Sequence, residues 1–140
     1  MIKMAKKRMT QGRALSALLL LCSFTGSPLA YAEDVERIDF DQLYEAFLNN
    51  DNSSLELPQY QKRLLISGVV LRNSVNFSGN PLLTVTSLSS DSEMARMTSY
   101  DAGQAEKMKN LQAGDEFKAI CILGPTVGGS SLSLRDCVLK

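Results

Sequence analysis

Two cysteines, Cys121 and Cys137, are the residues with the most specific chemistry in this sequence. Such a pair can form a disulfide bond, or one of its thiols can act as a nucleophile. The chain contains no His and no C-x-x-C motif, so neither thiol has a neighbour that would favour the reactive thiolate. The absence of His also excludes His-based catalytic triads and the usual zinc sites. The pair therefore favours a structural disulfide over a catalytic thiol.

Five acidic residues of the second half of the chain are the other candidates for chemistry: Asp91, Glu93, Asp115, Glu116 and Asp136. All five fall in expected turns or at expected strand ends, where carboxylates commonly cap backbone groups and face solvent. Their spacing does not match a D-x-D-x-D-G calcium loop, and the sequence has no Gly-rich phosphate loop or G-x-S-x-G motif. We therefore expect a protein that is not an enzyme and that has no metal site and no cofactor.

Residues 1–32 have the features of a secretory signal peptide. Five basic residues precede an apolar run from Ala14 to Phe24, and a small-x-small end follows at Ala30-Tyr31-Ala32. The apolar run has roughly half of the ~20 residues that a membrane-spanning helix needs, which disfavours an uncleaved anchor. Cys22 follows Leu21 rather than the small residue that lipoprotein processing requires. We therefore interpret Cys22 as an apolar residue of the signal peptide and not as a lipidation site. We expect cleavage near Ala32, no remaining membrane span, and a periplasmic or secreted protein.

Cleavage changes the charge and the cysteine count of the protein. The 140-residue chain has 15 basic and 15 acidic residues, but five of the basic residues and none of the acids lie in the leader. Residues 33–140 therefore carry a net charge of 10 − 15 = −5. They retain two cysteines in an oxidising compartment, which favours one disulfide. A content of 44% hydrophobic and 21% charged residues is typical of one globular domain.

The remaining residues predict a flexible leader over 33–39 and then a helix, three strands, a second helix and two strands. Asp39 and Gln42 resemble a capping box. The apolar residues that follow recur at helical spacing, which is more typical of core packing than of a ligand site: Phe40, Leu43, Tyr44, Phe47 and Leu48. Strands are expected at 64–71, 82–88, 94–100, 117–123 and 132–139. Gly68 predicts a bulge or a sharp coil in the first strand. Residues 72–81 are expected to form a turn. Asp101 is expected to begin the second helix and Gly114 to end it.

The last two expected strands would bring the cysteines together. In a hairpin centred on Gly129, Cys121 and Cys137 lie directly opposite each other because both are eight residues from its centre. Opposite residues have Cβ atoms about 4.5–5.5 Å apart, which is close to disulfide reach. Closing a loop of roughly 15 residues stabilises a domain by about 3 kcal/mol in the chain-entropy model.

The order of these elements resembles an OB-fold, and the sequence resembles the tRNA anticodon-like family of small bacterial exported OB-fold proteins. The matching stretches span about residues 40–139: Leu43-Tyr44 with Asn49-Asn50, YQKRLLISGVV from Tyr60, LQAGDEF from Leu111, and LSLRDCVL from Leu132. Lys62 departs from the sequence pattern of this family, which has Gly at the corresponding position. The resemblance implies a mainly β domain over residues 40–140. Its five-stranded OB-fold-like barrel would have an N-terminal helix and a helix between strands 3 and 4.

OB-folds commonly bind ligands on the face of their second and third strands. On residues 82–88 and 94–100, and in the 72–81 loop, the candidate contacts are Arg72, Phe77, Arg96 and Tyr100, and Arg135 could join the two arginines. Single-strand binders combine a positive groove with aromatic platforms, which the negative charge of residues 33–140 disfavours. We therefore expect a non-catalytic module for a protein or envelope component. The alternatives are a single-stranded nucleic-acid binder and a small-ligand or cation binder.

Overall fold

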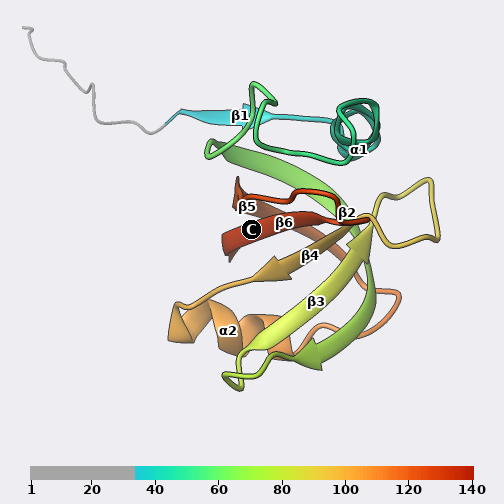
Figure 1. The fold of residues 1–140 in the computed structure, drawn as a ribbon. Helices are drawn as coiled ribbons and strands as arrows, with labels where there is room; N and C mark the ends of the chain where they lie inside the picture. Colours follow the sequence, from blue (N-terminus) through green and yellow to red (C-terminus); the bar gives the residue numbers. More distant parts are fainter. Residues whose placement is uncertain (1–33) are drawn as a thin grey trace, which may run out of the picture. The chain divides into compact units, whose positions relative to one another are not determined.

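The computed structural model describes residues 34–140, which form one compact unit. The expected signal peptide, its cleavage after Ala32 and the role of Cys22 lie outside the described residues. Figure 1 shows the elements in chain order: β1 (Val35–Arg37), α1 (Phe40–Asn49), β2 (Arg63–Val75), β3 (Pro81–Thr86), β4 (Ala95–Thr98), α2 (Ala102–Lys109), β5 (Glu116–Leu123) and β6 (Leu132–Leu139). Among these residues, no helix has the length and hydropathy needed to span a membrane.

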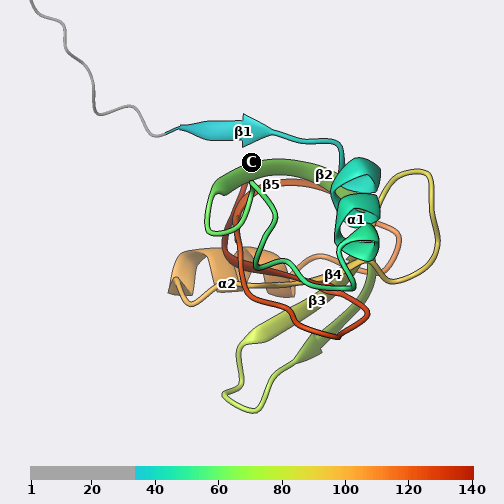
Figure 2. The same cartoon turned by 45° about the horizontal axis from the view of Figure 1, so that its top comes forward.

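Strands β2 to β6 close into a five-stranded barrel, as the resemblance to OB-folds implies. Their order is β2-β3-β4-β6-β5, and a β2–β5 pairing closes the ring. Long β2 makes this closure possible, because residues 63–69 pair with β5 and residues 69–75 pair with β3. The barrel pairs are antiparallel except β4–β6. Figure 2 shows β2 and β5 on one side of the barrel and β3 and β4 on the other.

The core lies inside this barrel and is completed by one face of α1. In α1, Asp39 accepts a hydrogen bond from the backbone N–H of Gln42 (3.0 Å), which confirms the predicted cap. Phe40, Leu43 and Phe47 are buried in the core, whereas Leu48 is 44% exposed. The expected apolar face is therefore correct but narrower than the spacing indicates.

The two cysteines lie opposite each other on β5 and β6, as predicted. Their sulfur atoms are 2.09 Å apart and their Cα atoms 4.1 Å apart. Both side chains are fully buried. The ladder shifts register beside the pair, where Asp136 has a positive φ of 51°, so β6 carries a bulge there.

Strand β1 lies where the sequence predicts a flexible leader. Residues 35–37 pair in parallel with residues 63–65 of β2, and the Ile38 N–H donates to the Leu65 carbonyl (3.4 Å). The side chains of this strand are mostly exposed. The segment lacks the alternation of apolar and polar residues that would predict a strand. It forms a strand because it pairs with the edge of β2.

The turn expected over residues 72–81 is shorter in the structure. Residues 72–75 extend β2 and pair with residues 81–84 of β3. Only residues 76–80 form the turn, where the Asn76 Oδ1 accepts from the N–H groups of Ser78 and Asn80. All four added residues of β2 are exposed. Because this end of the β2–β3 ribbon is exposed, its strand residues can be polar. In the sequence, such polar residues resemble those of a turn.

Two glycine predictions also differ from the structure. Glycine is required at position 68 because the backbone of β3 comes close: a Cβ at Gly68 would lie 2.4 Å from the Thr86 carbonyl oxygen. The register shift of β2 falls between Val70 and Arg72 instead.

Helix α2 is capped by Asp101 as expected but ends at Lys109. Gly114, with φ of 94°, forms the turn before β5, where its N–H donates to the Val70 carbonyl.

Candidate functional site

The outer surface of β3 and β4, with the adjoining β2–β3 and β5–β6 loops, forms the candidate site, which we call the β3–β4 face. OB-folds commonly bind ligands on the corresponding strands and loops. A pocket of about 460 Å³ lies on it, lined by Leu82, Arg96, Thr98, Gly129, Ser130, Ser131, Leu132 and Ser133. The lining combines one guanidinium group and several hydroxyl groups with two leucines, so it suits a ligand with polar groups.

Glu93 brings together two of the predicted site residues. Arg96 donates from Nε to Glu93 Oε2 (2.9 Å), and Arg72 Nη2 lies 3.4 Å from Glu93 Oε1. Ser131, from the β5–β6 loop, also donates to Glu93 Oε2. Arg72 reaches β3 as well, where its Nη2 is 3.4 Å from Thr84 Oγ1. The sequence assigns Glu93 only to a turn, and the structure makes it the centre of this cluster.

Arg135 does not join the cluster. It lies on β6 against Gly124, where a Cβ would be 2.7 Å from its Nε. The β3–β4 face therefore carries two arginines whose charge is partly neutralised by one carboxylate. Such a surface attracts polyanions less than an unpaired arginine pair would.

The cluster keeps Glu93 ionised. Burial raises the pKa of the Glu93 carboxyl, but the hydrogen bonds from Ser131 and Arg96, the charge of Arg96 and the hydrogen bond from Arg72 together outweigh it. The resulting pKa lies below the ordinary value of 4.5.

A Glu93→Gln variant is expected to lose about 1 kcal/mol of unfolding free energy at neutral pH, because the ion pairs are partly exposed. A lowered folded-state pKa stabilises the native protein above the ordinary value of 4.5, and this contribution disappears as the pH falls through the folded-state pKa. The difference between variant and wild type should therefore shrink in acid. Chemical denaturation across a pH series measures it, and a difference that stays constant with pH would contradict the role of Glu93.

The two predicted aromatic contacts lie at one end of the β3–β4 face. Phe77 is fully exposed in the β2–β3 turn, and Tyr100 is 69% exposed just after β4. Thr98 pairs with Leu82, next to the start of β3, so the segment carrying Tyr100 leaves the sheet near the turn that carries Phe77. Neither aromatic residue lies on a strand, although the sequence assigns Tyr100 to one.

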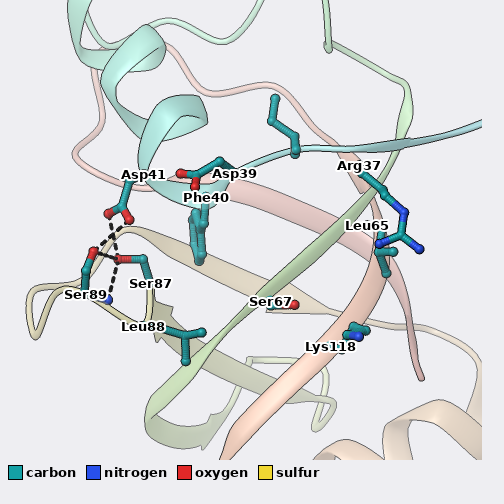
Figure 3. Close-up of a pocket in the computed structure, with 11 residues that line it drawn as sticks. Arg37, Asp39, Phe40, Asp41, Leu65, Ser67, Ser87, Leu88, Ser89 and Lys118 are labelled. Carbon is teal, nitrogen blue, oxygen red and sulfur yellow. Dashed lines mark hydrogen bonds between the residues drawn. The ribbon is translucent and has the colours of Figure 1, made fainter.

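A second pocket, of about 370 Å³, lies beside β2 where β1 ends and α1 begins. Figure 3 shows Arg37 and Lys118 on one side of it and Asp41 with Ser87 and Ser89 on the other. Asp41 accepts a hydrogen bond from each serine hydroxyl at 2.7 Å. These two bonds lower the pKa of the Asp41 carboxyl against the opposing effect of burial. This pocket could not be predicted from the sequence, because no local pattern relates its residues.

Residues 34–140 contain no group of three or more Cys, Asp or Glu residues placed to hold a metal ion.

No protein-family model and no curated protein sequence matches the chain. Among solved structures, it is similar to a lipoprotein of Klebsiella pneumoniae subsp. pneumoniae MGH 78578 that is described as a candidate nucleic-acid binder. The TM-score is 0.52 at 16% identity, over 76% of this chain and 92% of the lipoprotein. A candidate aspartyl-tRNA synthetase of Leishmania major Friedlin aligns with a TM-score of 0.46 at 8% identity, over 84% of this chain and 22% of the synthetase. The first similarity supports an OB-fold-like barrel, and neither assigns the chain to a particular family.

Proposed function

We propose that the chain is an exported, non-catalytic OB-fold module that binds a protein or another component of the cell envelope through the β3–β4 face and the β2–β3 turn. The observation that carries this proposal is the composition of that face. Arg72 and Arg96 pair with Glu93, Arg96 lines a pocket, and exposed Phe77 and Tyr100 lie at one end of the face. Aromatic residues and Arg are the residue types enriched at protein interfaces.

The arginines favour specific contacts over general attraction to anions. Glu93 holds Arg96 at 2.9 Å and Arg72 at 3.4 Å, which restricts both side chains before a partner binds. A restricted side chain loses less conformational entropy on binding than a free one. The guanidinium groups can therefore form directional hydrogen bonds at a low entropic cost.

Export is supported by three independent features. The leader sequence has the pattern of a signal peptide, the barrel contains a buried disulfide, and the similar Klebsiella protein is described as a lipoprotein. An oxidising compartment would keep Cys121 and Cys137 joined. Partners are therefore expected among periplasmic or outer-surface components.

Binding of single-stranded nucleic acid is the second candidate, and one observation favours it. The Klebsiella protein with a similar fold is described as a candidate nucleic-acid binder. Nucleic-acid affinity depends largely on phosphate neutralisation, and on the β3–β4 face Arg72 and Arg96 would have to supply it. Because both arginines of the β3–β4 face also contact Glu93, we rank this candidate below a protein or envelope partner.

A Phe77→Ser/Tyr100→Ser variant is expected to lose at least tenfold in affinity for the partner, because exposed aromatic residues are frequent hot spots of interfaces. The exposure of both side chains means that the melting temperature should remain close to that of wild type. The partner is first captured by crosslinking to the tagged, exported protein in the envelope fraction, and its dissociation constant is then measured by calorimetry.

A Leu48→Ser/Leu88→Ser variant is the matched control, since it removes two exposed aliphatic residues that lie off the β3–β4 face. Equal losses in the two variants would refute the assignment of the face. A separate titration with a single-stranded oligonucleotide tests the second candidate. Tight, salt-sensitive binding that Phe77→Ser/Tyr100→Ser abolishes would replace the protein partner with nucleic acid.

A further inference from the structure

The outer surface of β1, β2, β5 and the end of β6 has a different chemistry from the β3–β4 face, and we call it the β2–β5 face. Register shows which side chains share it, because directly paired residues point to the same side of a sheet. One row contains Val35, Arg63, Ile122 and Arg135, a second Arg37, Leu65, Ile120 and Val138, and a third Ser67 and Lys118. The three rows therefore combine cations with aliphatic side chains, and in the first row the two kinds alternate.

The aliphatic side chains of these rows are not fully covered. Leu65, Ile120, Ile122 and Val138 are half-buried, whereas their neighbours on the inner side of the barrel, such as Leu64 and Cys121, are fully buried. Arg37 and Lys118 are exposed beside them. The face thus presents apolar surface and positive charge together.

Two cations of this face are available for a ligand. Among residues 34–140, no ion pair or hydrogen bond involves the side chain of Arg37 or of Lys118. Figure 3 shows them close to Leu65 and Ser67 at the edge of the second pocket. The arginines of the β3–β4 face differ, because both contact Glu93.

The acidic residues near this face lie outside the three rows. Asp41 accepts hydrogen bonds from Ser87 and Ser89, and Asp39 caps α1. Glu116 follows in the next row, opposite Val69, and Asp136 lies in the bulge of β6. The three rows themselves contain no acidic residue.

We propose that the β2–β5 face docks on the anionic lipid surface of a membrane. Lys and Arg side chains near such a surface interact with lipid phosphates, and adjacent aliphatic groups enter the headgroup boundary. The rows contain no aromatic residue, so they lack the stacking platforms that single-stranded nucleic acid requires. Lipid is therefore the polyanionic partner that this composition fits.

The net charge of residues 33–140 does not oppose this docking. Charges separated by more than about 8–10 Å are largely screened at physiological ionic strength, so the bilayer responds to the cations that face it. Docking would also leave the β3–β4 face accessible, because Figure 2 shows β3 and β4 on the opposite side of the barrel from β2 and β5. This inference does not depend on the partner proposed for the β3–β4 face.

Vesicle co-sedimentation tests the docking surface. The protein is purified after export and processing, because the basic residues 3–13 of the leader would bind anionic vesicles themselves. We expect binding to phosphatidylcholine vesicles that contain phosphatidylglycerol and none to pure phosphatidylcholine. An Arg37→Gln/Lys118→Gln variant should bind about 25-fold more weakly, since each cation near an anionic surface accounts for about fivefold, or about 1 kcal/mol.

A Lys107→Gln/Lys109→Gln variant is the matched control, because it removes the same charge from α2, outside the three rows. Its affinity for anionic vesicles should change by less than about twofold. Equal weakening in both double variants, or no binding of wild type at low ionic strength, would overturn the proposal. Retained partner binding by Arg37→Gln/Lys118→Gln is expected, and it separates this proposal from that for the β3–β4 face.

Discussion

A Phe47→Ala variant is expected to lose about 4 kcal/mol of unfolding free energy, since truncation of a buried Phe typically costs about 3–5 kcal/mol. Phe47 is fully buried in the core that joins α1 to the barrel, and its ring packs against Tyr44 with centroids 5.9 Å apart. A small domain has only about 5–15 kcal/mol of stability. Chemical denaturation should therefore show a large decrease in the midpoint.

The neighbouring position provides the control for this experiment. Leu48 is 44% exposed on the same helix, so Leu48→Ala should change the unfolding free energy by less than about 1 kcal/mol. If Phe47→Ala and Leu48→Ala had similar small effects, α1 would not belong to the cooperative core of the barrel.

Removal of the disulfide with a Cys121→Ala/Cys137→Ala variant is expected to lower the unfolding free energy by about 3 kcal/mol. The bond closes a loop between residues 16 positions apart, and loss of a native disulfide from a small secreted domain typically costs about 2–5 kcal/mol. Alanine is preferred to serine because both positions are fully buried and a buried hydroxyl would add its own cost. Thermal unfolding monitored by circular dichroism measures the decrease.

A reductant provides the internal control. It should lower the melting temperature of the wild-type protein toward that of the double variant and leave the double variant unchanged. A wild-type protein whose intact mass shows two free thiols, and whose melting temperature does not respond to the reductant, would contradict the structural role of the pair.

Several elements of the fold could be predicted because short-range patterns encode them. The Asp39 cap and the spacing of Phe40, Leu43 and Phe47 indicated α1 correctly, since a helix is defined by residues three and four positions apart. The Cys121–Cys137 pair could be predicted because a single hairpin sets its register. The limits of β2 could not, because exposed strand residues such as Asn73 and Ser74 resemble turn residues in sequence.

The candidate site was predicted only in part. Arg72, Phe77, Arg96 and Tyr100 were selected from the expected face, and the structure brings the two arginines together on one carboxylate. Phe77 and Tyr100 lie beyond the ends of the strands and outside that cluster. Nothing in the local sequence distinguished Glu93 from other turn carboxylates, because its role depends on its tertiary neighbours.

The sequence by itself therefore determined the order of the elements from α1 to β6, the cysteine pair and the negative charge of residues 33–140, since each depends on composition or on local spacing. The tertiary structure alone decided which distant side chains meet. Closure of the barrel places Ser131 on Glu93, 38 residues earlier, and the pairing of β1 with β2 aligns Arg37 with Leu65 and Ile120. The physical reason is that strand pairing between remote segments fixes these neighbours, and no local pattern encodes the register of such pairs.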